Sequence, residues 1–139
     1  MTYEQWEMSV PTEIRSDSLW RVRAYRLALF LAHLAWIDTE KLFGQNRTSH
    51  HADQLLRAAS KISSSISEGY SRDTAKARAT YYDYATGSPR ETRDWYFKLR
   101  RVLADEVVAH RMDLTTQLIK LSLKMIATER RSNRRVSAS

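Results

Sequence analysis

Residues that make turns and cross-links are scarce in this chain of 139 residues, which has no cysteine, three glycines and two prolines. The lack of cysteine excludes disulfides, thiolate metal sites and thiol catalysis. Turns depend on glycine and proline, so their scarcity favours a few long helices over a strand-rich fold. The composition otherwise fits one globular domain, because 42% of the residues are hydrophobic and the chain is long enough to bury an ordinary core.

Long hydrophobic runs are also missing. The longest apolar stretch covers residues 27–32 and is interrupted by His33, well short of the roughly 18 residues that a membrane span needs. The N-terminus carries Glu4 and Glu7 and lacks the basic and then apolar order of a signal peptide. These features predict a cytoplasmic protein with no membrane partner.

Positive charge is in excess, with 23 lysines and arginines against 16 acidic residues and a net charge of +7. Residues 1–14 carry three glutamates and no lysine or arginine, so the rest of the chain holds +10. A basic body favours polyanionic partners such as RNA or DNA. A surface charge that only keeps the protein in solution explains the same numbers, and both interpretations stay open.

Hydrophobic periodicity predicts four helices. The first spans about 17–43, where Val22, Leu29, Trp36 and Phe43 recur at seven-residue intervals. A second apolar stripe lies beside this one and consists of Ala24, Leu27, Leu31 and Leu34. Such a wide apolar face suits packing both inside a bundle and against another subunit. The other helices are expected at about 52–68, 73–106 and 110–131.

The predicted fold is all-α, an antiparallel up-down-up-down four-helix bundle over residues 16–131, because four amphipathic helices are joined by short connections. Residues 1–15 contain Pro11 and no sustained hydrophobic period, which predicts a loosely ordered leader that Trp6 could dock onto the bundle. Residues 132–139 form a basic tail that is expected to be flexible.

Two short segments stand out in the middle of the chain. The segment SSSISEGYSR brings many small side chains to the end of the second helix, where Gly69 suits the left-handed position after the last turn. The segment ATGSPRE, residues 85–91, contains Pro89, which either kinks one long helix or starts a new one. Ser88 and Glu91 would form the capping box of such a new helix. The unbroken apolar period favours one kinked helix.

These segments resemble a four-helix-bundle family, the 23S rRNA intervening-sequence proteins. The family pattern has an RRA segment, then N-I-A-E-G-[FY]-x-R, then A-x-G-S-x-x-E. Here the matching segments are Arg57-Ala58-Ala59, residues 65–72 and residues 85–91, within a resemblance that spans about 17–126. Ser65 and Ser67 replace the usual asparagine and alanine but keep the small size that packing requires. A structural role is expected for Glu68, Gly69, Gly87, Ser88 and Glu91.

The resemblance implies a left-handed antiparallel bundle assembled as a ring-like homopentamer. It also implies kinship with the accessory protein of diversity-generating retroelements, which binds nucleic acid and a reverse transcriptase. A reverse transcriptase is therefore one protein partner that the resemblance suggests.

No arrangement in the sequence is typical of an enzyme. The sequence has no nucleophile paired with a base and no glycine loop that would hold a phosphate. Asp73, Asp83 and Asp94 are too scattered for a metal-dependent nuclease. His50 and His51 are adjacent in a polar loop and cannot easily face one metal ion. We expect a non-enzymatic protein with no metal and no cofactor.

Basic residues provide the leading functional hypothesis. Lys120, Lys124 and Arg131 fall at positions i, i+4 and i+11, so they line one side of the fourth helix. Such a stripe suits phosphate contacts without base reading. The alternative is a solvated face with local ion pairs. The predicted nucleic-acid contacts are Arg57, Arg72, Arg93, Arg100, Arg101, Lys120, Lys124 and Arg131.

The end of the second helix also admits two interpretations. Glu68 and Arg72 are four residues apart. Either they form part of a binding site with Arg57, or they form a capping or intersubunit ion pair next to a glycine turn. For the whole protein, the first hypothesis is an oligomeric adaptor that binds RNA or DNA. The alternative is a protein-interaction scaffold that binds no nucleic acid.

Overall fold

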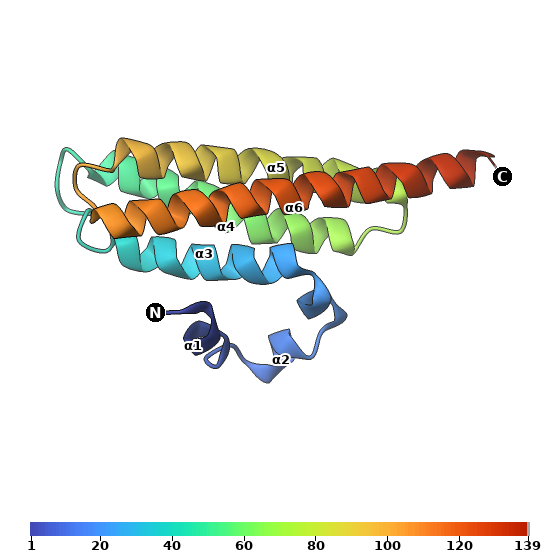
Figure 1. The fold of residues 1–139 in the computed structure, drawn as a ribbon, viewed down its shortest axis with the longest axis horizontal. Coiled ribbons are helices and arrows are strands. Elements are labelled where there is room, and N and C mark those ends of the chain that lie inside the picture. Colours follow the sequence, from blue (N-terminus) through green and yellow to red (C-terminus); the bar gives the residue numbers. More distant parts are fainter. Residues whose placement is uncertain (139) are drawn as a thin grey trace.

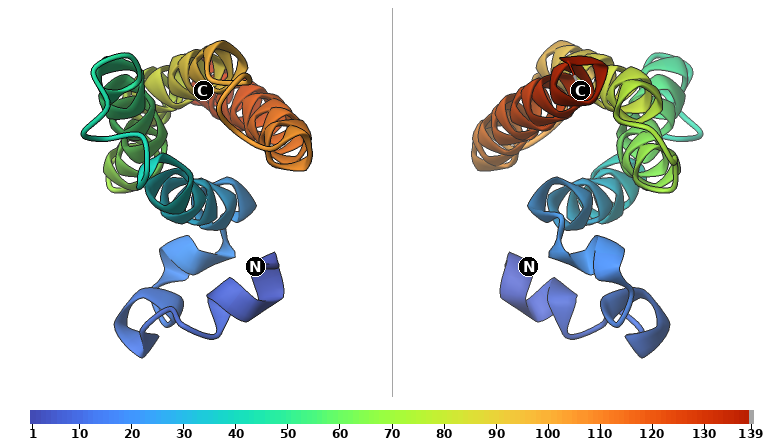
Figure 2. Two further views of the ribbon diagram at one scale, coloured as in Figure 1. Left: turned by 90° about the vertical axis from the view of Figure 1, so that its left-hand side faces the viewer. Right: turned by 90° about the vertical axis from the view of Figure 1, so that its right-hand side faces the viewer.

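The computed structural model describes residues 1–138 and consists of helices joined by short connections, with no strand among these residues. The long helices lie side by side, and consecutive ones run in opposite directions (Figure 1). Viewed end-on, they follow one another around an arc (Figure 2). They are α3 (Arg23–Thr39), α4 (Ser49–Tyr70), α5 (Ala75–Lys98) and α6 (Asp105–Ala138). The predicted all-helical bundle is confirmed, and the pentameric ring stays a prediction.

The helix predicted over residues 17–43 is shorter in the structure. The Asp17 side chain accepts a hydrogen bond of 2.9 Å from the Leu19 N–H and caps a single 3-10 turn, η1 (Ser18–Arg21). Val22 is then extended, so α3 begins only at Arg23. After α3 the chain turns, and Gly44 adopts a φ of +87°, which glycine tolerates best.

The boundary between the third and fourth predicted helices was also misplaced. Helix α5 ends at Lys98, and residues 99–104 form turns closed by backbone bonds such as Val102 N–H to the Leu99 carbonyl, at 3.0 Å. Helix α6 starts at Asp105, where two acidic residues of the first turn favour a helix N-terminus. Helix α5 continues through Pro89, so the prediction of one helix there is confirmed.

The basic tail is helical where a flexible segment was predicted. Helix α6 runs to Ala138, and no glycine or proline follows Pro89 in the sequence to end it. Basic residues near the end of a helix also complement its dipole. Residue 139, the last residue of the predicted tail, lies outside the described residues.

The leader is packed against the bundle rather than loosely ordered. It contains α1 (Tyr3–Glu7) and α2 (Thr12–Arg15), and Trp6 is only 6% exposed. The Trp6 ring lies 5.3 Å from the ring of Phe30 on α3, between ring centroids. Burying a tryptophan removes a large apolar area from water, which anchors a segment too short to be stable alone.

The core contains the apolar rows predicted for α4, where Leu55, Ala59, Ile62 and Ile66 are fully buried. On α3 it is the second of the two predicted stripes that faces the core. Ala24, Leu31 and Leu34 of the second stripe are buried, whereas Trp36 and Phe43 of the seven-residue stripe are 68% and 40% exposed. Because both stripes are apolar, the periodicity alone could not decide which one faces the core.

Candidate nucleic-acid interface

The outer face of α6 carries the predicted basic stripe. Lys120, Lys124 and Arg131 are all exposed, as their spacing predicted. Between residues 120 and 138 the sequence has six lysines and arginines against one acidic residue, Glu129. Most of the net charge of the chain therefore lies on the C-terminal half of this helix.

Glu129 does not neutralise this face, because its side chain points toward α5. Its Oε2 lies 3.0 Å from Nε of Arg78, which also donates a bond of 3.0 Å to the Arg72 carbonyl. Glu129 and Arg78 are both partly buried in this ion pair. Lys120, Lys124 and Arg131 thus form no ion pair with a carboxylate of the described residues.

Two other predicted contacts lie beside this stripe. Arg93 of α5 donates a hydrogen bond of 3.2 Å to Thr116 Oγ1, one turn before Lys120. Arg72 lies in the connection between α4 and α5 and places its guanidinium 4.8 Å from the centroid of the Tyr81 ring. Through Arg78, the backbone of Arg72 is joined to Glu129 at the same end of the bundle.

The remaining predicted contacts lie elsewhere, so the eight residues do not form one site. Arg57 is on α4 and pairs with Asp53 at 2.9 Å, a helix-face pair of the kind expected from local spacing. Arg100 and Arg101 follow α5 at the opposite end of the bundle from Arg72. Arg100 packs its guanidinium 4.1 Å from the centroid of the Phe97 ring.

Gly69 is important for packing rather than for a turn, so the left-handed assignment was wrong. It lies inside α4, and among residues 1–138 only Gly44 has a positive φ. A Cβ at Gly69 would approach Tyr82 Cε1 to 2.8 Å and Tyr81 Cβ to 2.9 Å. The missing side chain therefore allows α4 and α5 to come together closely.

The other motif residues make few contacts. Glu68 is exposed, and no ion pair joins it to Arg72 within the described part of the chain. Gly87 is exposed, and a Cβ there would meet no atom within 4 Å. Ser88 and Glu91 lie within the continuous α5, so they form no capping box.

A buried polar cluster was not predicted. Asp38 of α3 accepts hydrogen bonds from Arg111 Nε (2.8 Å) and Nη2 (3.0 Å) on α6 and from the Tyr96 hydroxyl (2.7 Å) on α5. The Arg111 and Asp38 side chains are 10% and 6% exposed. The sequence signal was an aspartate directly after the apolar run that ends at Ile37, since such a carboxylate needs a buried partner.

This cluster fixes its own protonation states. Burial, and then the Asp38 charge, raises the pKa of Tyr96 well above its usual range, so its hydroxyl stays protonated and donates. Burial opposes the charge of Arg111, but the bonds and charge of Asp38 outweigh it and raise the pKa of Arg111. The same arginine, after burial, lowers the pKa of His110, whose Nδ1 lies 2.6 Å from Arg111 Nη1. The hydrogen bonds of the cluster join α3, α5 and α6.

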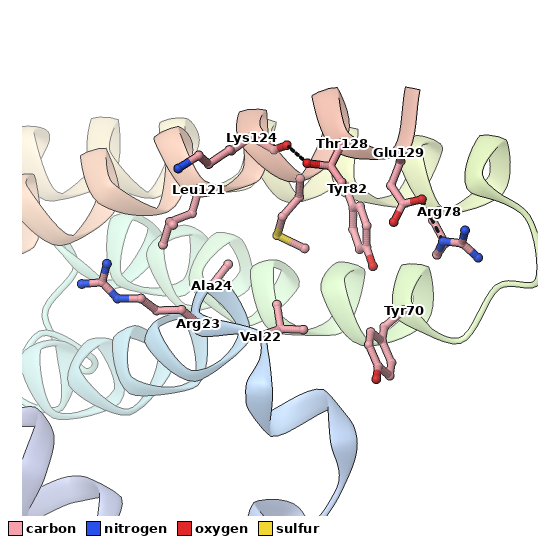
Figure 3. Close-up of a pocket in the computed structure, with 11 residues that line it drawn as sticks. Val22, Arg23, Ala24, Tyr70, Arg78, Tyr82, Leu121, Lys124, Thr128 and Glu129 are labelled. Atoms are coloured by element: carbon pink, nitrogen blue, oxygen red, sulfur yellow. Dashed lines mark hydrogen bonds and ion pairs between the residues drawn. The ribbon is translucent and has the colours of Figure 1, made fainter. Parts of the chain in front are cut away.

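A pocket of about 590 Å³ opens between the start of α3, the end of α4, and helices α5 and α6 (Figure 3). Sequence reasoning missed it because its walls come from four separate elements. Arg23 and Lys124 lie at one end of it, and the Arg78–Glu129 ion pair lies at the other. Burial, and then the Glu129 charge, raises the pKa of Tyr82 on its wall to about 12, so this hydroxyl is a donor at neutral pH.

Clusters of metal ligands and membrane-spanning helices are both absent from residues 1–138. No group of three or more histidine or acidic side chains there could hold a metal ion. Instead of converging on a metal, His51 packs edge-on against Trp95, with 5.4 Å between ring centroids. None of the helices in this described range is long and apolar enough to cross a membrane.

Comparison with known proteins places the chain in a family. The sequence model of the 23S rRNA-intervening sequence protein family matches residues 21–127, so the chain belongs to this family. A crystal structure of a protein with unknown function from the S23 ribosomal protein family of Bacteroides thetaiotaomicron has a similar fold. Its TM-score is 0.69 at 19% identity, over 74% of this chain and 97% of that one. No curated protein matches the chain.

Proposed function

We propose that the protein is a non-enzymatic adaptor that binds RNA or DNA through phosphate contacts along the outer face of α6. The observation that carries this proposal is the set of exposed cations at residues 120, 124 and 131, whose one neighbouring carboxylate is turned inward to Arg78. The family name, which refers to an intervening sequence of ribosomal RNA, agrees with a role near nucleic acid.

The mechanism is electrostatic docking without base reading. At a rise of 1.5 Å per residue, Lys120 and Arg131 lie roughly 17 Å apart along α6. Duplex DNA carries a charge about every 1.7 Å along its axis when both strands are counted, so a duplex segment as long as this stripe holds on the order of ten phosphates, of which only those facing α6 can be contacted. Phosphate contacts position a duplex but carry no sequence information, so we expect tight binding with little sequence preference.

Charge reversal at Lys120, Lys124 and Arg131, each to glutamate, is expected to weaken RNA binding at least about 100-fold near 0.1 M salt. Each lost phosphate contact removes counterion release, so the slope of log K against log salt should become shallower by roughly 0.9 per contact for a duplex. Fluorescence anisotropy of a labelled duplex over a salt series measures both quantities.

The matched control is the triple variant Lys41→Glu, Arg47→Glu and Lys61→Glu, which changes the net charge equally at exposed positions away from α6. It should keep most of the affinity, because only the overall field changes. Equal losses in the two triple variants would contradict a defined interface on α6.

We also propose that the adaptor is a homo-oligomer, a pentamer by the family resemblance. Trp36 and Phe43 expose large apolar areas on α3 and the turn after it and line a hollow of about 200 Å³ with Leu56, and the neighbouring Ile37 is also exposed. An exposed apolar patch of this kind is typical of an interface between proteins. The same patch favours the second candidate function, a scaffold that docks a protein partner such as a reverse transcriptase.

Trp36→Glu is expected to shift the assembly to a smaller species, because a charged side chain would be desolvated at the interface. Light scattering coupled to size-exclusion chromatography measures the mass. Tyr84→Glu on α5, where the tyrosine is 58% exposed, serves as the control and should leave the mass unchanged. If Trp36→Glu retains the wild-type mass, this patch is not the assembly interface.

A further inference from the structure

The pocket between α3 and α6 has a graded polarity. At one end lie the charged groups of Arg23 on α3 and Lys124 on α6, and both extend away from the middle of the pocket (Figure 3). Its middle is apolar and is formed by Val22, Ala24, Leu121 and Met125. At the other end lie polar groups that donate and accept hydrogen bonds, namely Tyr82, Thr128 and the carboxylate of Glu129.

The cationic end is prepared for an anion. Neither Arg23 nor Lys124 forms an ion pair with any carboxylate among residues 1–138. Helix α3 also begins beside the pocket, after Val22, without a side-chain cap, so the N–H groups of its first turn add positive partial charge to the pocket. These positive charges line a pocket of about 590 Å³, which lies within the range of about 300–1,000 Å³ that is usual for small-molecule sites.

We propose that this pocket binds a single nucleotide, with its phosphate between Arg23 and Lys124 and its base against the apolar middle. The polar end then faces the edge of the base, where the Tyr82 hydroxyl donates and the Glu129 carboxylate accepts. A fatty acid would leave these groups at the polar end without partners when it excluded water from them, which costs free energy. The order of phosphate, flat ring and hydrogen-bonding edge matches a nucleotide from one end of the pocket to the other.

This inference rests on the proposed function, because Lys124 belongs both to the α6 stripe and to the pocket. A strand that docks along α6 can place one unstacked nucleotide in the pocket, because the bases of single-stranded nucleic acid are free to pack against protein side chains. Free nucleotide and a nucleotide within a strand share the same chemistry, and the two sources are distinguished by experiment.

The test uses the full chain labelled at its methionine methyl groups and observed by NMR. The sequence has four methionines, of which only Met125 lines the pocket, so Met1, Met8 and Met112 are internal controls. The probes are adenosine monophosphate, ribose 5-phosphate and a single-stranded RNA oligonucleotide. Anisotropy of the same oligonucleotide, labelled, records strand binding separately.

We expect the oligonucleotide to shift the Met125 methyl signal and ribose 5-phosphate to leave it in place, since the sugar phosphate lacks a base. A shift with adenosine monophosphate as well supports binding of a free nucleotide, whereas a shift with the oligonucleotide alone supports capture from a strand. A shift with adenosine monophosphate in a protein that binds no strand supports the pocket and contradicts the proposed function.

Two results would overturn the inference. In the first, anisotropy shows that the oligonucleotide binds but the NMR signal of the Met125 methyl group does not shift. This result leaves the proposed function intact. In the second, ribose 5-phosphate gives the same shift as the nucleotide, which reduces the site to an anion site.

A charge-matched pair of variants tests the phosphate contact. Arg23→Gln should weaken binding of the probe that shifts the Met125 methyl signal by about tenfold, as expected for the loss of one charge-assisted hydrogen bond. Arg21→Gln removes the same charge two residues away, at an exposed position outside the pocket, and should change the affinity less than twofold. Equal effects of the two variants would show that Arg23 does not contact the phosphate.

Discussion

Replacing Asp38 with alanine is expected to lower the free energy of unfolding by about 3–5 kcal/mol, because it leaves the buried guanidinium of Arg111 without its carboxylate. Three hydrogen bonds of 2.7–3.0 Å are lost at once, from Arg111 Nε, Arg111 Nη2 and the Tyr96 hydroxyl. Urea unfolding followed by circular dichroism, at one fixed protomer concentration, measures the change.

The control replaces the whole cluster with apolar groups of similar size, as Asp38→Leu, Arg111→Met and Tyr96→Phe together. Apolar replacement of a complete buried ion pair is often neutral or stabilising, so most of the lost stability should return. A loss below about 1 kcal/mol for Asp38→Ala would show that water enters the cluster and that it is not the buried network described above.

Gly69→Val is expected to destabilise the protein by at least about 2 kcal/mol, because the new side chain overlaps the α5 helix. The first added carbon would already lie 2.8 Å from Tyr82 Cε1 and 2.9 Å from Tyr81 Cβ. The Tyr81 Cβ is attached to the backbone, so it cannot move unless α5 moves with it. Thermal and urea unfolding should both report the loss.

Gly87→Val is the matched control, since Gly87 is also helical but a Cβ there would meet no atom within 4 Å outside its own stretch of helix. Valine and glycine differ by only a few tenths of a kcal/mol in helix propensity, so this variant should stay within about 0.5 kcal/mol of wild type. Similar stabilities for the two valine variants would mean that α4 and α5 are not in close contact at Gly69.

Periodicity was sufficient where one face of a helix is clearly apolar. The buried row of α4 and the continuity of α5 through Pro89 could both be predicted, because each depends on neighbours within a few turns. The boundaries were less predictable. The start of α3 depends on the cap at Asp17 and the extended Val22, and the packing of the leader depends on a contact between Trp6 and the distant Phe30.

The candidate site shows the same division between local and distant information. The exposed α6 stripe follows from helical spacing alone, so the sequence predicted it. The sequence could not show that Glu129 turns inward to Arg78, 51 positions away, or that Arg111 finds Asp38, 73 positions away. Nor could the sequence show whether Arg57 pairs with Asp53 on its own helix or joins the other arginines in one interface, since its position in the sequence allows both.

Phosphate binding by the outer face of α6 is the central property proposed for this protein. The most direct measurement is the anisotropy of labelled duplex DNA, structured RNA and single strands with the wild-type protein, from about 50 to 300 mM salt. We expect submicromolar binding at the lowest salt that weakens steeply as salt rises, with a slope that counts the phosphate contacts. No binding at the lowest salt would contradict the account and make the basic surface a feature of solubility alone.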